Sequence, residues 1–97
     1  MAKTKVKITK DTNDRRKCHP DPVNFQAVTG DEVTFEFKDE PNASITFKNN
    51  NSPFNEPVVL DKPMRIRDGA AGKHFDYTIV WPGGGTGAAS GDVGPSR

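Results

Sequence analysis

The chain has 97 residues, of which 32% are hydrophobic and 28% charged, and its formal net charge is +1. This length allows one small domain, and the near-neutral charge gives no overall attraction to nucleic acid or to an anionic membrane. The single cysteine, Cys18, excludes an internal disulfide. No apolar run approaches the ~20 residues of a membrane-spanning helix, and the first residues lack the apolar core of a secretory signal. We therefore expect a cytoplasmic protein without membrane contacts; a chain trimmed of its signal would look the same.

Apolar and polar residues alternate through most of the chain, as is typical of half-buried strands. The alternating or apolar segments are residues 5–10, 23–27, 33–38, 43–47, 58–60, 64–67 and 75–81. Residues 11–21 are polar and contain Pro20, so they predict a long connection. Residues 83–97 are glycine-rich and nearly without large apolar side chains, so they predict a flexible tail after a domain of residues 1–82.

Seven short strands separated by turn residues indicate an all-β fold, a small Greek-key sandwich. Its core would contain the inward-facing apolar residues of the strands, namely Val6, Ile8, Phe25, Val33, Phe35, Phe37, Ile45, Phe47, Ile66, Phe75, Tyr77 and Ile79. Complete burial of each large apolar side chain contributes roughly 1.5–3 kcal/mol. A dozen such residues are enough to support a domain of this size.

Three segments of the chain resemble the cupredoxins, the blue-copper β-sandwich family. They are GDEVTFEF at residues 30–37, PNASITF at residues 41–47 and KHFDYTI at residues 73–79. The resemblance implies a cupredoxin-like sandwich, but it also implies copper ligands that this chain lacks. Asn42 and Ala43 stand where the family has a histidine, and no Cys, His or Met follows Trp81, where the family's ligand loop belongs. The family's usual final strand is not evident either, so we expect a copper-free member without a cofactor.

An irregular metal site is the alternative from another class of protein. Cys18, His19, His74 and Met64 match the residue types of a blue-copper centre, although their order and spacing differ from the family's. Such a site would make the chain a metal-binding or electron-transfer protein. The competing interpretation is an exposed Cys-His pair, a core methionine and a histidine near a turn. The basic residues next to Cys18 also predict a lowered pKa for its thiol.

A basic stretch begins the chain, with seven Lys or Arg residues and two Asp residues in the first 17. It suggests weak polyanion binding, but no aromatic residue precedes Phe25, so nucleic acid is not the expected partner. Alternating lysines equally suit a solvated edge strand. The candidate contact surface is made of Lys5, Lys7, Arg15, Arg16, Lys17 and Trp81.

No segment carries a recognisable set of catalytic residues. The pattern Gly83-x-Gly85-x-x-Ala88 lacks the following helix of a dinucleotide-binding turn. We therefore expect a non-catalytic, metal-free interaction or structural module. It would be a monomer with a protein partner that the sequence does not identify, bound at an exposed edge strand or at the aromatic end near Trp81.

Overall fold

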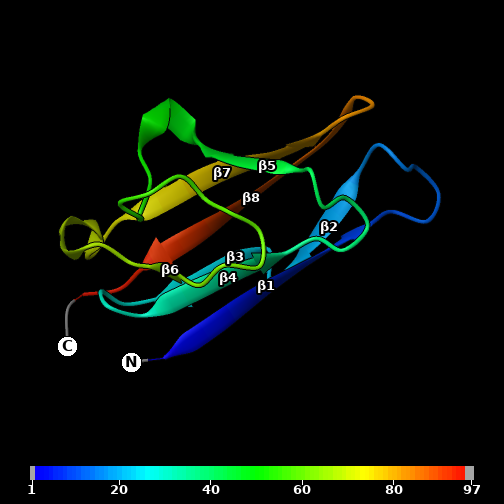
Figure 1. Ribbon diagram of the computed structural model, residues 1–97. Coiled ribbons are helices and arrows are strands. Elements are labelled where there is room, and N and C mark those ends of the chain that lie inside the picture. The colour runs from blue at the N-terminus through cyan, green and yellow to red at the C-terminus, as the bar shows by residue number, and fades with distance from the viewer. Residues whose placement is uncertain (1, 96–97) are drawn as a thin grey trace.

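Two four-stranded sheets pack face to face in the computed structural model, which describes residues 2–95 (Figure 1). Sheet A has the strand order β2 (Cys18–Asp21), β1 (Lys3–Lys10), β4 (Glu32–Glu36) and β6 (Met64–Arg65). Sheet B has the order β3 (Asn24–Ala27), β8 (Gly85–Val93), β7 (His74–Trp81) and β5 (Ser44–Phe47). The predicted all-β sandwich is confirmed. Its two 3₁₀ turns, η1 (Lys48–Asn50) and η2 (Asp68–Ala70), have three residues each, so residues 2–95 contain no helix that is long and apolar enough to cross a membrane.

The chain passes from one sheet to the other between β2 and β3, at the cis peptide bond of Asp21–Pro22. Two of the strand pairs are parallel, β1 with β4 and β3 with β8, and the others are antiparallel. Parallel neighbours cannot be joined by a tight hairpin, because the chain must cross over between them. Residues distant in sequence therefore meet within both sheets.

The core lies between the sheets, and all twelve residues predicted for it are buried. The structure adds six further apolar residues: Ala27, Phe54, Met64, Ala70, Trp81 and Val93. Aromatic rings dominate the centre, where Phe35 lies edge-on to Tyr77 with 5.5 Å between ring centroids. Edge-on aromatic pairs contribute about 0.5–1.5 kcal/mol beyond their buried area.

The prediction of a flexible tail is wrong for residues 85–93, which form β8. This strand pairs with β7 over eight residue pairs and with β3 over four, so it lies inside sheet B. The domain therefore extends past residue 82. Pro95 is the last described residue, and residues 96 and 97 lie outside the part that the structure describes.

The glycines of β8 leave room for large side chains from other strands, and these side chains cover the inward face of β8. A Cβ atom built on Gly85 would lie 1.8 Å from the Trp81 ring, and one on Gly91 would lie 2.1 Å from the Phe25 ring. Both distances are far inside van der Waals contact. The apolar side chains that stabilise β8 thus come from its neighbours, and its own sequence does not show them.

A second correction concerns residues 11–21, which were expected to be a connection throughout. Their last four residues form β2, which pairs antiparallel with the end of β1. Pro20 is buried there and faces Ile8 in the register, although it cannot donate a backbone hydrogen bond. An edge position tolerates this loss because one side of the strand has no neighbour to bond.

Candidate functional site at the free edge of strand β5

The metal-ligand candidates do not come together. The Cys18 side chain covers Gly87 of β8, whereas His74 is paired with Asp92, five residues further along that strand. Five residues of a strand span about 17 Å. His19 is exposed and forms a hydrogen bond with Asp11. Within residues 2–95, no group of three or more His, Cys, Asp or Glu side chains is placed to hold a metal ion.

The predicted chemistry of Cys18 also needs correction. Its side chain is half-buried against β8, and this burial raises the pKa of the thiol. The basic residues before it do not reverse the effect of desolvation, which disfavours the charged thiolate. The predicted reactive thiolate is therefore not supported by the environment of Cys18.

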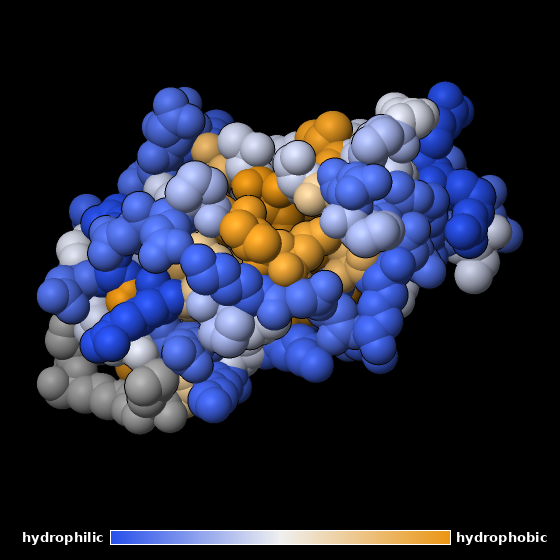
Figure 2. Space-filling view, in the orientation of Figure 1, coloured by the Kyte–Doolittle hydropathy of each residue, from blue (hydrophilic) through white to orange (hydrophobic). Residues whose placement is uncertain are grey.

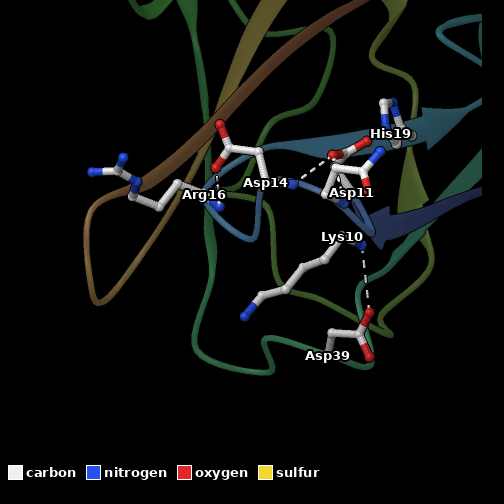
Figure 3. Close-up of polar contacts among 7 residues, drawn as sticks. Lys10, Asp11, Asp14, Arg16, His19 and Asp39 are labelled. Carbon is white, nitrogen blue, oxygen red and sulfur yellow. Dashed lines mark hydrogen bonds and ion pairs between the residues drawn. The ribbon is translucent and has the colours of Figure 1, made fainter.

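His19 takes part in ordering the loop between β1 and β2 (Figure 3). The Asp11 carboxylate accepts hydrogen bonds from the backbone N–H groups of Asn13 at 3.0 Å and Asp14 at 2.7 Å, and it is 2.7 Å from Nε2 of His19. These bonds, with His19 first, lower the pKa of Asp11. The backbone N–H of Arg16 in turn donates to Asp14, while the Arg16 side chain extends away from the loop. These side-chain contacts are local, and the carbonyl oxygen of Arg16 also accepts a hydrogen bond from the N–H of Thr86 at 3.0 Å, which joins the loop to β8.

His74 belongs to a separate polar network on the outer face of sheet B. Its Nδ1 forms a short hydrogen bond with Asp92, and its Nε2 lies 3.0 Å from Asp76. These two carboxylates, with Asp92 first, raise the pKa of His74. Asp92 also accepts a hydrogen bond from Asn24 on β3. Since both ring nitrogens face carboxylates, His74 links strands and has no nitrogen left to act as a general base.

The basic residues of the candidate contact surface occupy different parts of the molecule. Lys5 is 3.0 Å from Glu36 and, as the largest cause, holds the pKa of that carboxyl below its usual value. Lys7 lies between Glu36 and Asp21 in the sheet register. Arg15, Arg16 and Lys17 are exposed in the loop beyond β1. Acidic neighbours partly neutralise the lysines of β1, and polyanion binding stays a prediction.

Trp81 is not a contact surface, which corrects the sequence analysis. The side chain is only 4% exposed. Its ring lies edge-on to Phe37 at 5.2 Å, and Nζ of Lys10 is 5.9 Å from the ring centroid. Lys10 is itself paired with Glu40. Trp81 therefore closes one end of the core.

Both edges of sheet A are protected against pairing with another chain. β2 contains Pro20. β6 has two residues, and the loop before it covers its edge: Phe54 bridges to Ile66, and the N–H of Arg67 donates to the carbonyl oxygen of Pro53 at 2.8 Å. Proline, short strands and covering loops are the usual means of blocking an edge.

The edge of β5 has no such protection, and neither has that of β3, whose sequence Asn-Phe-Gln-Ala is likewise free of proline and charge. β5 pairs with β7 on one side and ends sheet B on the other. Its sequence, Ser-Ile-Thr-Phe, contains no proline and no charge. Ser44 and Thr46 are exposed, while Ile45 and Phe47 face the core. β5 therefore offers sheet B an unprotected edge for a further strand.

A hollow of about 390 Å³ lies beside this edge, between β5 and the loop that follows it. Its apolar lining comes from Ile45, Phe47, Phe54 and Val58, and polar residues that include Asn50 and Glu56 surround them. Figure 2 shows apolar side chains gathered in a hollow on this face and framed by polar ones. An apolar surface beside unpaired backbone groups suits an extended segment that carries apolar side chains.

Sequence reasoning identified β5 as a strand and named an exposed edge strand as a candidate surface, but it could not tell which strand lies at an edge. The absence of charge and proline in residues 43–47 is a signal that residues 23–28 share, so it did not single out β5. Comparisons with known proteins add no assignment: no family model, no curated protein and no solved structure matches the chain.

Proposed function

We propose that the protein is a non-catalytic binding module that accepts an extended segment of a partner along the free edge of β5. The observation that carries this proposal is the combination of an uncharged, proline-free edge strand with an apolar hollow beside it. Backbone hydrogen bonds to β5 would provide affinity. The hollow would select a segment with an apolar side chain on its inward face.

A copper-free, cupredoxin-like sandwich remains part of this proposal. It is supported by β8, a final returning strand of the kind that the resemblance implies. It is also supported by the packing of Trp81 against Phe37, at the end of the sandwich where the family's ligand loop would lie. An aromatic ring would there take the structural role of a metal centre. A non-catalytic role is supported by the His74 network, in which both ring nitrogens are engaged.

The test uses a capped synthetic peptide of alternating isoleucine and threonine, titrated into the protein and followed by amide NMR. We expect shifts confined to Ser44–Phe47 and to the hollow residues Phe54 and Val58. The same peptide with alternate amides N-methylated cannot donate hydrogen bonds to the edge and should not bind. Shifts spread over β2, β3 and β6, or no shifts at all, would rule out β5 as the acceptor.

A matched pair of variants separates the edge from the face. Thr46 and Thr78 are directly opposite each other on β5 and β7, and both are exposed on the outer face of sheet B. Thr46→Lys places a charge on the edge strand, whereas Thr78→Lys places the same charge one strand further in. Lysine on an edge discourages pairing. Peptide binding should therefore be lost in Thr46→Lys and retained in Thr78→Lys.

A further inference from the structure

Arg67 is a half-buried arginine without an acidic partner in residues 2–95. Its Nε donates a hydrogen bond to the carbonyl oxygen of Ser52 at 2.7 Å, and its Cζ lies 6.0 Å from the centroid of the Phe75 ring. No carboxylate of the described residues forms an ion pair with it. Arginine that is withdrawn from water is usually paired. The Nη groups, which carry most of the N–H donors of the guanidinium, are therefore available to an acceptor from outside the chain.

The neighbours of Arg67 fix the position of its guanidinium. A Cβ atom built on Gly69 would lie 2.7 Å from Nη1 of Arg67, so the glycine leaves the room that this nitrogen occupies. The bond from Nε to Ser52 sets the direction of the planar group. A donor group that is ordered before binding loses little conformational entropy when its ligand arrives. Arg67 is thus preorganised to present its Nη donors.

Arg67 lines a hollow of about 380 Å³ between the loop residues 54–56 and the segment 62–68. This hollow is distinct from the one beside β5, although residues 54–56 line both. Lys62 and Glu56 also line it, and they neutralise each other in an ion pair at 2.8 Å. The remaining charged residues of the lining are Arg65, Arg67 and the exposed Asp68.

Arg65 is a second arginine without an ion pair in the described part of the chain. Glu32 lies opposite it on β4, but the two side chains are not joined by a salt bridge. Arg65 belongs to β6, and Arg67 has an extended backbone with φ −75° and ψ 157°. Residues two apart in an extended chain project from the same face, about 7 Å from each other. Both guanidinium groups can therefore contact one small ligand.

From this arrangement we infer that the hollow binds a phosphate group, as free phosphate or as a phosphate monoester, between Arg65 and Arg67. Guanidinium groups bind the oxygens of carboxylates and phosphates in pairs. A planar carboxylate is satisfied by one arginine, whereas the tetrahedral phosphate group can offer oxygens to two. The inference goes beyond the proposed function and does not depend on it, because neither arginine belongs to the edge of β5.

Titration of the protein with inorganic phosphate at constant ionic strength, followed by amide NMR, tests the site. Saturating shifts should be concentrated in residues 64–69, and Ser44–Phe47 should not respond. Methyl phosphate, titrated in the same way, distinguishes an ester from the free anion, and binding of either one supports the inference. Acetate should bind more weakly than both. The inference is overturned if neither phosphate compound gives saturating shifts at residues 64–69, or if acetate binds there equally well.

Substitutions at the hollow test its geometry. Arg65→Gln and Arg67→Gln should each weaken phosphate binding about tenfold or more, because each removes charge-assisted hydrogen bonds. Arg65 is exposed, so its variant is expected to fold even if Arg67→Gln does not. Gly69→Ala keeps the net charge but should also weaken binding, since the new methyl group displaces Nη1 of Arg67. Arg15→Gln removes the same charge from the exposed loop after β1 and should leave the affinity unchanged. Equal losses in Arg15→Gln and Arg65→Gln would show general charge attraction and contradict the site.

Discussion

The sulfur of Cys18 occupies the place where a side chain on Gly87 would begin. A Cβ atom built on Gly87 would lie 2.3 Å from Sγ of Cys18, and the remaining Cys18 atoms are 3.9 Å or more away. Cys18 begins β2 in sheet A, and Gly87 lies in β8 of sheet B. The two residues are thus a complementary pair across the sandwich, and only the sulfur atom stands between them.

The pair predicts a suppression experiment. Gly87→Ala should destabilise the protein by about 1–3 kcal/mol, the usual range for overpacking a core. In the Cys18→Ala background the same change should cost clearly less, because the colliding sulfur is gone. Urea unfolding of the wild type, both single variants and the double variant gives the coupling free energy, for which about 0.5–3 kcal/mol is typical of contacting residues. Additive losses would show that Sγ and Gly87 do not share this space.

Gly85 differs from Gly87, because the atoms that a side chain at Gly85 would meet belong to the Trp81 ring. A Cβ atom there would lie 1.8 Å from the Trp81 ring, which Phe37 holds from another side. Gly85→Ala should therefore destabilise the fold by about 3 kcal/mol, the upper end of the overpacking range. Thr86→Ala on the exposed face of the same strand is the control and should change stability by less than about 0.5 kcal/mol. Equal effects of the two substitutions in urea unfolding would contradict the packing of Trp81 on Gly85.

Tyr77 carries a polar atom without a partner. Its hydroxyl is buried, and no hydrogen bond to it is present among the described residues. Burial is also the main reason that the pKa of this phenol is strongly raised. An unsatisfied buried hydroxyl costs about 1–3 kcal/mol, so Tyr77→Phe should leave the free energy of unfolding unchanged or increase it. Tyr77→Leu should lower it, because the ring contacts with Phe35 and Phe47 are lost. A clear loss of stability in Tyr77→Phe would reveal a hydrogen-bond partner of this hydroxyl.

The His74 network predicts how stability depends on pH. The pKa of His74 in the folded state is raised above its ordinary value of 6.5, first by Asp92 and then by Asp76. Its stabilising contribution is therefore complete below pH 6.5 and is lost as the pH rises through the folded-state pKa. The pKa of Asp92 is lowered, first by Asn24 and then by His74. The contribution of Asp92 is thus present above its ordinary value of 3.8 and is lost as the pH falls through the lowered pKa.

Urea unfolding at a series of pH values checks this expectation. His74→Gln should remove the decline in stability above pH 6.5, while the decline in acid should remain. Asp76→Asn should bring the decline above pH 6.5 to lower pH, because one of the two carboxylates that raise the pKa of His74 is gone. A wild-type profile that is flat from pH 6.5 upward would contradict the linkage.

The core could be predicted because its signal is local. In β4, Val33 and Phe35 alternate with polar residues, and in β7 Phe75, Tyr77 and Ile79 do the same, so a period of two identifies the inward face without knowledge of neighbours. β8 has the same period, but its inward positions are mostly glycines. Their meaning depends on rings and a sulfur contributed by other strands, and composition alone favours disorder.

The candidate site could be predicted only in part, for a related reason. The sequence of β5 shows a short strand without charge, but strand order decides whether it lies at an edge or in the middle. For Trp81 the sequence suggested exposure where the structure shows burial. An aromatic residue beside a glycine-rich turn suggests an exposed contact, but the side chains of Lys10 and Phe37, from two other segments, enclose Trp81. Edges and end caps are properties of the assembled sheets.

The parallel pairing of β3 with β8 has a consequence for how the chain folds. Ser90 donates to Asn24 over a separation of 66 residues, and β3 has no other neighbour in its sheet. Sheet B is therefore complete only when these two distant segments have met. The chain loses the entropy of the intervening loop before it gains the contacts between the two strands. Folding should be slow for a domain of this size, with the β3–β8 pair forming late. Until then β8, already paired with β7 through a short turn, has one open side, so the open edge of sheet B passes from β8 to β3 only when β3 is in place.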